Sequence, residues 1–104
     1  GSAARQTGLA TKRTIVQLME FYQAFRMKKI TTATWLKETG RLVDKLIALD
    51  ENSAAARLFK AQLLITEERF NEASWFLDHA EELLKSSELA EQQAENDRLR
   101  ARAG

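Results

Sequence analysis

The only histidine of the chain, His79, stands beside Asp78 and three residues before Glu82, so these side chains are the first candidates for a reactive or metal-binding site. A metal ion needs several ligands that converge on one point, and the chain offers no second histidine and no cysteine to complete such a set. Ser74, Asp78 and His79 are the residue types of a nucleophilic triad, but Asp78 and His79 are adjacent and diverge on a helix. We therefore expect no metal and no cofactor, and we interpret the cluster as a solvated or half-buried helix surface.

Acidic side chains are numerous around this histidine. Two carboxylates act as acid and base only when they face each other across a cleft, and acids on the outside of a helix are usually solvated. The chain also has no glycine-rich phosphate loop. We therefore predict that the protein is not an enzyme and has no catalytic residues. The acids concerned are Glu67, Glu68, Glu72, Glu81 and Glu82.

A basic stretch, Arg26-Met27-Lys28-Lys29, follows the aromatic residues Tyr22 and Phe25. Cations with aromatic neighbours can bind single-stranded nucleic acid. Three cations are few, however, and the acidic second half of the chain would repel a phosphate backbone. We therefore favour a protein or peptide partner over a nucleic acid.

The elements that position these residues are predicted to be helices. The chain has 104 residues, no proline and only four glycines, and no segment alternates between apolar and polar residues as a strand would. An apolar content of 44% suits a single small domain with a modest core. The fold class expected from these features is all-α.

Membrane insertion is not expected, because no apolar run approaches the roughly 18 residues that span a bilayer. Lys12, Arg13 and Glu20 interrupt the first apolar segment, which is also wrong for a signal peptide. We expect a cytoplasmic location on these grounds. The initial Gly1-Ser2 is typical of a pair left by cloning, so we expect the chain to be part of a longer protein.

The chain is organised around residues 52–84, where two helical patterns flank a polar turn from Thr66 to Arg69. Residues three or four apart share one face of a helix. Alanines on such a face allow a neighbouring helix to approach closely, so we predict an antiparallel hairpin with interlocking small and large residues. The stripes are Leu58, Ala61, Gln62 and Ile65 in the first helix, and Phe70, Ala73, Leu77, Ala80 and Leu84 in the second.

A second helical pair is expected before this hairpin. Its first helix should begin at Gly8 or Thr11 and leave residues 1–8 as a disordered tail. Its second helix should begin with Thr31 or Thr32 as N-cap and run to about Leu49, with Gly40 at a close helix crossing or a kink. A break at residues 85–87 should separate this domain, residues 9–85, from a polar C-terminal capping helix or tail, residues 86–104.

The two pairs also repeat. Ile30 and Ala33 open the second helix of one pair as Phe70 and Ala73 open that of the other, forty residues later, and Gly40 corresponds to Ala80 in the same way. Repeated helix pairs are typical of an α-solenoid. The chain here resembles the tetratricopeptide-repeat (TPR) family, through the small, aromatic and large positions Ala61, Leu64, Phe70, Ala73, Leu77 and Ala80.

The family resemblance implies a short right-handed TPR-like solenoid with a concave surface lined by the first helix of each pair. A non-enzymatic scaffold or assembly module would bind a peptide or helix there. The alternative fold is a four-helix bundle whose alanine register is accidental. The concave positions implied by the resemblance are Ile15, Leu18, Tyr22 and Arg26 from one pair and Leu58, Gln62 and Thr66 from the other; core packing is the alternative role, above all for Leu18 and Leu58.

Two further features point to contacts. Trp75 lies off the main stripe, so we predict that it either anchors a partner or packs on the C-terminal helix or a missing repeat. Residues 1–47 carry a net charge of +6 and residues 48–104 carry −5. The alternative function is therefore self-assembly, in which the basic half of one copy binds the acidic half of another.

Overall fold

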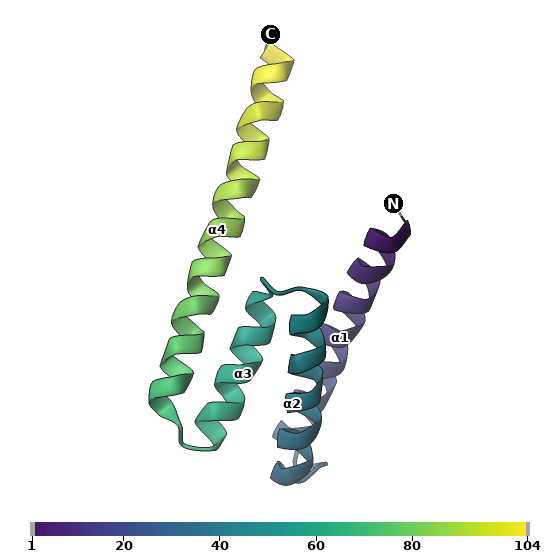
Figure 1. Cartoon of the computed structure of the whole chain (residues 1–104), viewed down its shortest axis with the longest axis vertical. Coiled ribbons are helices and arrows are strands. Elements are labelled where there is room, and N and C mark those ends of the chain that lie inside the picture. Colours follow the sequence, from purple (N-terminus) through teal and green to yellow (C-terminus); the bar gives the residue numbers. More distant parts are fainter. Residues whose placement is uncertain (1, 104) are drawn as a thin grey trace.

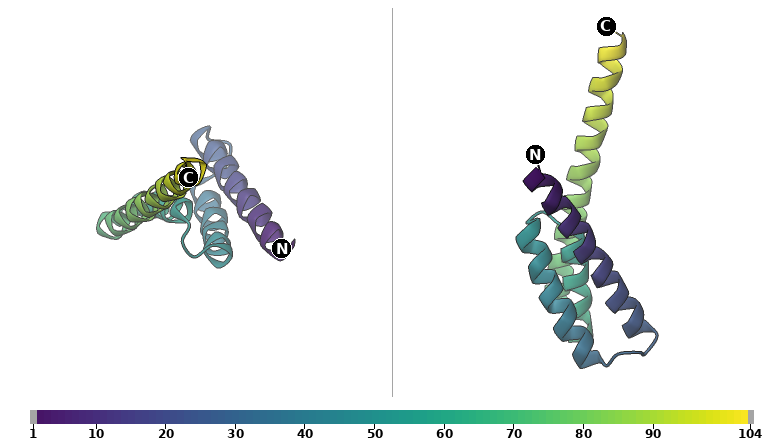
Figure 2. Two further views of the ribbon diagram at one scale, coloured as in Figure 1. Left: turned by 90° about the horizontal axis from the view of Figure 1, so that it is seen from above. Right: turned by 90° about the vertical axis from the view of Figure 1, so that its right-hand side faces the viewer.

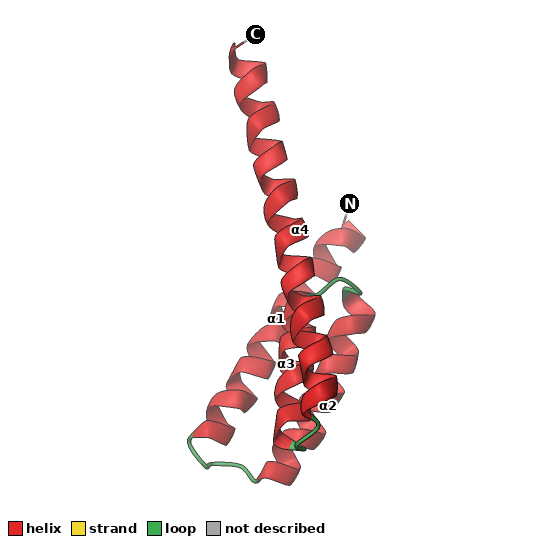
Figure 3. Ribbon diagram, turned by 90° about the vertical axis from the view of Figure 1, so that its left-hand side faces the viewer, coloured by secondary structure: helices red, strands yellow, loops and turns green. Residues whose placement is uncertain are grey.

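The computed structural model describes residues 2–103 and is all-helical, which confirms the predicted fold class. Its helices are α1 (Ser2–Arg26), α2 (Thr32–Leu49), α3 (Ala54–Thr66) and α4 (Phe70–Ala103), and each packs on the next in the chain (Figure 1). The loops that join them are short (Figure 3). None of the helices within these residues is both long enough and apolar enough to cross a membrane.

Side-chain caps fix the starts of α2 and α3. The hydroxyl of Thr31 accepts a hydrogen bond from the Thr34 amide at 3.1 Å, so Thr31 is the N-cap of α2, one of the two residues predicted. The buried Ser53 does the same for α3, accepting from the Ala56 amide at 3.1 Å. Each cap pairs one of the amides that the first turn of a helix leaves without a partner.

The ends of α1 and α3 share one geometry. Lys28 and Glu68 have positive φ values of 59° and 63°, a conformation that L side chains adopt at a cost. After each of them, an amide bonds back five residues, Lys29 to the Ala24 carbonyl and Arg69 to the Leu64 carbonyl, both at 2.8 Å. This pattern closes a helix and reverses the chain.

An ion pair follows the second of these turns. Arg69 donates through Nε to the Glu72 carboxylate at 3.0 Å. The hydrogen bond lowers the pKa of Glu72 below its usual value and raises the pKa of Arg69. The acid lies in the first turn of α4, where the helix N-terminus also favours negative charge.

The main core lies between α1, α2 and α3. Trp35 of α2 is buried and stacks on Phe25 of α1, with ring centroids 4.5 Å apart and an angle of 14° between the planes. Most of the fully buried side chains come from α2, with further members from α1 and α3. The buried apolar members are Leu18, Trp35, Leu42, Val43, Leu46, Ala56 and Leu63.

The α3–α4 hairpin is closed by small residues, as predicted. Ala73 and Ala80 of α4 are 2% and 0% exposed, and Ala73 packs with Ala61 and Leu64 of α3 and with the half-buried Phe76. The large members of the predicted α4 stripe differ, since Phe70, Leu77 and Leu84 stay between 40% and 60% exposed. Close approach of α3 therefore uses the alanines, and the flanking large side chains are left on the surface.

Two predicted boundaries are wrong within the described residues. Helix α1 begins at Ser2, so residues 2–8 are helical and not a disordered tail. Helix α4 continues through Lys85-Ser86-Ser87 to Ala103 without a break. Nothing in either segment stops a helix, because serine costs little propensity and no proline is present. The part of α4 after residue 86 caps no hairpin but projects away from the other helices (Figures 1 and 2).

The correspondence between the two pairs is also shifted from the one expected. The turns are forty residues apart, at Lys28 and Glu68, but α2 begins two residues later after its turn than α4 does. Counted from the start of each helix, the fourth and eleventh residues are Trp35 and Leu42 in α2 and Ala73 and Ala80 in α4. All four are buried. Ala33 is exposed, and a Cβ on Gly40 would meet nothing within 4 Å, so no close crossing requires that glycine.

Candidate protein-binding groove

Three helices form an open groove of about 330 Å³ on one face of the molecule. Helix α1 contributes Tyr22, α3 contributes Leu58, Phe59 and Gln62, and α4 contributes Leu77. Leu58 and Gln62 are four residues apart and therefore point the same way from α3. The floor of the groove is thus α3, and its two walls come from the first and last helices.

The wall from α1 is held in place by aromatic contacts. The Tyr22 ring meets Phe59 of α3 edge-on, with centroids 6.5 Å apart, and lies 6.4 Å from the ring of Trp35. Such tilted and edge-to-face pairs are favourable arrangements for aromatic rings. Tyr22 therefore touches both neighbouring helices, which fixes its ring at the groove before any ligand arrives.

Exposed apolar side chains extend the groove along the hairpin. On α3, Leu58 and Ile65 are seven residues apart and 42% and 38% exposed. On α4, Phe70, Leu77 and Leu84 follow the same seven-residue spacing. Residues seven apart lie two turns apart on one helix face, so these side chains make two parallel apolar rows. The rows flank the alanine contact that joins α3 and α4.

Polar chemistry in the groove comes from few groups. The Gln62 amide can donate and accept hydrogen bonds, and the Tyr22 hydroxyl can do both as well. Thr66, the third contact residue predicted on α3, is not among the residues that line the groove, and its hydroxyl donates to the Gln62 carbonyl at 2.9 Å. An apolar surface with one central amide suits recognition of a side-chain pattern more than it suits acid–base chemistry.

The predicted contact residues divide between several places. Tyr22, Leu58 and Gln62 meet in the groove, as their positions required. Leu18 is fully buried in the core, which is the other role considered for it, and Ile15 packs half-buried beside that core. Arg26 lines a separate depression at the α1–α2 turn with Phe25, Lys28, Ile30, Thr31 and Thr32.

Sequence patterns alone did not identify two residues of the groove as contacts. Phe59 was not predicted as a contact, although it is next to Leu58 and lies three residues before Gln62 on the same helix. Leu77 was assigned to the α3–α4 interface as part of the alanine stripe, and it lies instead on the edge of that interface, 40% exposed. The signal for Leu77 was its size, because a leucine cannot enter the close contact that Ala73 and Ala80 make.

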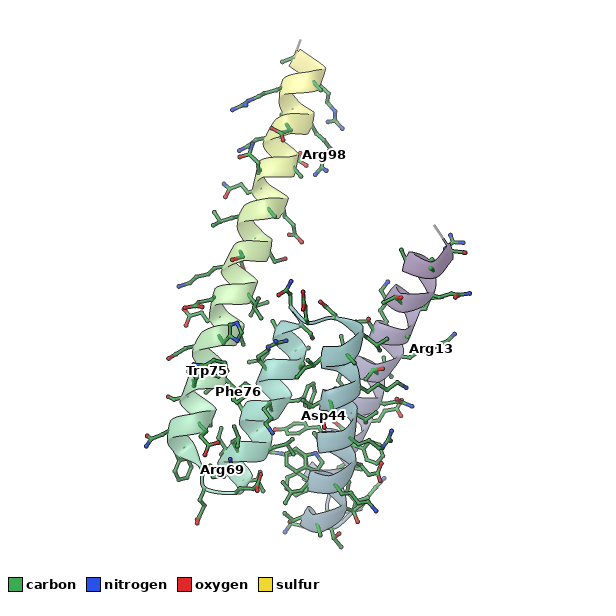
Figure 4. All side chains as sticks on the ribbon, viewed as in Figure 1. Arg13, Asp44, Arg69, Trp75, Phe76 and Arg98 are labelled. Atoms are coloured by element: carbon green, nitrogen blue, oxygen red, sulfur yellow. The ribbon has the colours of Figure 1, made fainter. Side chains whose placement is uncertain are left out.

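Trp75 lies on another face of α4. Trp75 precedes Leu77 by two positions, which corresponds to a rotation of about 200° around the helix axis. Its ring is 59% exposed and lies 5.2 Å from the His79 ring, and both line a shallow depression with Asp78 and Glu82 (Figure 4). Trp75 therefore belongs to a surface separate from the groove. It does not pack on the C-terminal part of α4, which continues the same helix.

No group of three His, Asp or Glu side chains within residues 2–103 is arranged to hold a metal ion. The Nδ1 atom of His79 is buried and has no hydrogen-bond partner among the residues that the structure describes. Asp78 and Glu82 line the same depression, but the three residues are not brought together as a ligand set. The predicted absence of catalysis and of cofactors stays a prediction.

Comparison with known proteins gives a family and no function. The comparisons with curated proteins and with solved structures each found no match. A family model described as the N-terminal part of a family of unknown function, DUF5717, matches residues 1–100. This match includes the groove and nearly all of the projecting part of α4. The chain therefore belongs to the DUF5717 family and corresponds to its N-terminal region.

Proposed function

We propose that the chain is a non-enzymatic interaction module that binds a helix or extended segment of a protein partner in the groove between α1, α3 and α4. One observation carries this proposal. Tyr22, Leu58 and Gln62, chosen as contact residues from two separate helical pairs, line the same groove together with Leu77. A site assembled from distant parts of the sequence is preformed by the fold, which reduces the entropy that binding costs.

The shape of the surface favours an amphipathic helix as ligand. A helix presents apolar residues at positions i, i+3, i+4 and i+7, and the two rows on α3 and α4 offer apolar contacts at the same two-turn interval. Leu58 and Ile65 form one row, and Phe70, Leu77 and Leu84 form the other. Gln62 would then pair with a polar group near the middle of the ligand, because an unpaired amide in a dry interface is costly.

The arrangement of the helices supports a TPR-like module as the fold of this site. Two helical pairs follow one another, their turns lie forty residues apart, and α2 packs on α3 to join them. A TPR-like right-handed stack would make α1 and α3 the helices that line its concave side. Tyr22 of α1 and Gln62 of α3 are the residues at the groove that this proposal requires.

Selection of ligands from a displayed library of helical peptides tests the proposal. The library would be selected on the wild-type chain, and each enriched peptide would be titrated against variants by calorimetry. Tyr22→Ala, Gln62→Ala and Leu77→Asp should each raise the Kd at least about tenfold, which corresponds to about 1.4 kcal/mol. Trp75→Ala, a change at an exposed position on the other face of α4, is the control and should leave the Kd unchanged.

The melting temperature separates binding from folding. Gln62 is exposed and has no side-chain hydrogen bond within residues 2–103, so Gln62→Ala should melt close to the wild-type temperature. A large loss of stability in that variant would contradict the role proposed for Gln62. Peptides whose binding depends on Trp75 and not on Tyr22 or Leu77 would place the binding surface elsewhere.

A further inference from the structure

Two helix segments project beyond the packed part of the molecule at the same end. In α4, the described residues after Leu83 are all exposed, and in α1 all the described residues before Ala10 are exposed. Helix α4 leaves the hairpin at Ser86 and Ser87, which line a depression with Asp50 and Asn52 of the α2–α3 loop. We call residues 84–103 the α4 overhang and residues 2–9 the α1 overhang (Figures 1 and 2).

The α4 overhang is stabilised as a helix by local features only. Lys85 pairs with Glu81 and Arg98 pairs with Glu95, each within one turn of the helix. Helices gain most of their stability from packing an apolar face, and short isolated helices are marginal even when rich in alanine. A surface that packs against the overhang would therefore stabilise it further.

The packing face of α4 continues into the overhang. Ala73 and Ala80 contact α3, and residues at alternating steps of three and four continue that face beyond the end of α3. Four of them are small, namely Ser87, Ala90, Ala94 and Ala101, and the one between Ala94 and Ala101 is Asp97. A helix that packs there can approach as closely as α3 approaches the first half of α4.

The charge of α4 indicates which helix packs against it. Residues 84–97 of α4 carry Glu88, Glu91, Glu95 and Asp97 against Lys85, a net charge of −3, while the last turns of the overhang are basic through Arg98, Arg100 and Arg102. Glu88 and Glu91 form no salt bridge with any described residue. The complementary surface of this chain is the start of α1, where Arg5, Lys12 and Arg13 are also outside every ion pair within residues 2–103.

The start of α1 also offers apolar contacts. Leu9 and Val16 are seven residues apart, 46% and 51% exposed, and line a shallow depression with Lys12 and Arg13. On the α4 overhang, Leu84 and Leu89 are 48% and 67% exposed. Arg13 points away from α2 into solvent (Figure 4). Leu84, Glu88 and Glu91 share one face of α4, whereas Leu89 points to another side. The face with Leu84 therefore combines an exposed aliphatic side chain with charge opposite to that beside Leu9 and Val16.

We propose that two copies of this chain assemble by docking the acidic part of the α4 overhang, residues 84–97, of each copy on the basic first half of α1 of the other. The contact occurs twice and is related by a two-fold axis, which is the commonest symmetry of protein dimers. Both overhangs lie at one end of the molecule, so both contacts involve that end of each copy (Figure 1). Leu84 belongs both to this contact and to the α4 row that extends the groove, whereas the residues that line the groove itself lie outside the contact.

Charge reversal with a rescue tests the pairing. One variant carries Arg5→Glu and Lys12→Glu, and the other carries Glu88→Lys and Glu91→Lys. Light scattering and sedimentation would measure the Kd of self-association of each variant at chain concentrations from micromolar to millimolar. Each variant alone should associate at least about tenfold more weakly than wild type, since like charges then face each other in both contacts. An equal mixture of the two variants should recover the association, because both contacts again join opposite charges.

The control is Lys37→Glu with Lys45→Glu, the same charge change on exposed positions of α2 outside the proposed interface. It should leave association unchanged. Raising the salt from about 0.01 M to about 1 M shortens the Debye length from about 30 Å to about 3 Å and should weaken the wild-type dimer. Circular dichroism of each variant checks that the helices are retained.

A third measurement needs no variant. Amide hydrogen exchange of residues 88–97 should slow on raising the concentration of wild-type chain, because docking suppresses the opening of that helix. A wild-type monomer at low salt over the whole concentration range would overturn the proposal, as would a dimer in which exchange of residues 88–97 is unchanged. Failure of the mixed variants to associate, or equal weakening by the α2 control, would overturn it too.

Discussion

Replacing Ala73 by leucine tests the contact that closes the α3–α4 hairpin. Ala73 is 2% exposed and packs against Ala61, Leu64 and Phe76. Leucine adds three carbons at a place where the two helix backbones approach, so either the helices separate or side chains leave their preferred rotamers. Overpacking of this kind costs about 1–3 kcal/mol of unfolding free energy. In a domain of this size the same loss lowers the melting temperature by roughly 4–20 °C.

Urea and thermal unfolding would measure the effect, followed by circular dichroism and by the fluorescence of the buried Trp35. Ala48→Leu is the matched control, because Ala48 is exposed on α2 and the change of side chain is identical. It should alter the unfolding free energy by less than about 0.5 kcal/mol. Ala80→Leu should behave as Ala73→Leu does. If both α4 variants have the same unfolding free energy as the wild type, the inference that α3 and α4 approach closely at these alanines is wrong.

Three other substitutions have expected outcomes that the same unfolding experiment measures. Gly40→Ala should raise the unfolding free energy by about 1 kcal/mol, because the added Cβ meets no atom within 4 Å and alanine is the better helix former; no gain would mean that the glycine is required. Thr39→Val should raise it by about 1 kcal/mol, since the buried Thr39 hydroxyl has no hydrogen-bond partner within residues 2–103, whereas Thr14→Val removes a bond to the Ala10 carbonyl and should give no gain. Glu68→Gly should raise it by about 0.5–1 kcal/mol because glycine tolerates the positive φ of 63°, and the neighbouring change Glu67→Gly, at a φ of −85°, should lower it.

Local signals in the sequence were sufficient for the helices and their caps. The absence of proline, the threonine before α2 and the serine before α3 act within a few residues, so the sequence predicted α2 and α3 with their ends nearly in place. The start of α1 at Ser2 and the continuation of α4 beyond Ser87 were not predicted, because a helix ends only where a residue or a contact ends it. Gly8 lowers helix propensity by about 1 kcal/mol relative to alanine, and Ser86 and Ser87 lower it by less, but neither cost ends a helix that no tertiary contact opposes.

The candidate groove was predicted in part, since three of its residues were named and two were missed. Periodicity identified which side of α3 carries Leu58 and Gln62, but it does not say which neighbour covers that side. Leu18 and Tyr22 lie four residues apart on one face of α1, yet Leu18 is buried and Tyr22 reaches the groove. The difference arises because the buried part of that face is covered by α2 and α3, and only the packed structure fixes where the cover ends.

The repeat proposed above pairs α2 with α4, and the two helices differ on the face that a further helix would cover. The face of α2 at its fifth, twelfth and sixteenth residues is apolar and buried or half-buried: Leu36, Val43 and Ile47. The same positions of α4 are Ser74, Glu81 and Lys85, all exposed, and Lys85 pairs with Glu81 at 3.0 Å. That hydrogen bond also raises the pKa of Lys85.

A helix that stacked on α4 through this face would have to bury an ion pair and a serine in place of apolar side chains, which is unfavourable unless new hydrogen bonds replace the lost water. Terminal helices of stacked repeats have such a polar outer face. Ser74→Leu with Glu81→Val and Lys85→Ile would copy the α2 surface onto α4. Because α4 would then expose an apolar stacking face, this variant should self-associate in a manner that high salt does not weaken, unlike the charge-dependent contact of the overhangs. A variant that stays as monomeric as the wild type in high salt would show that the face of α4 does not correspond to that of α2, and that the two-residue shift between the helical pairs is wrong.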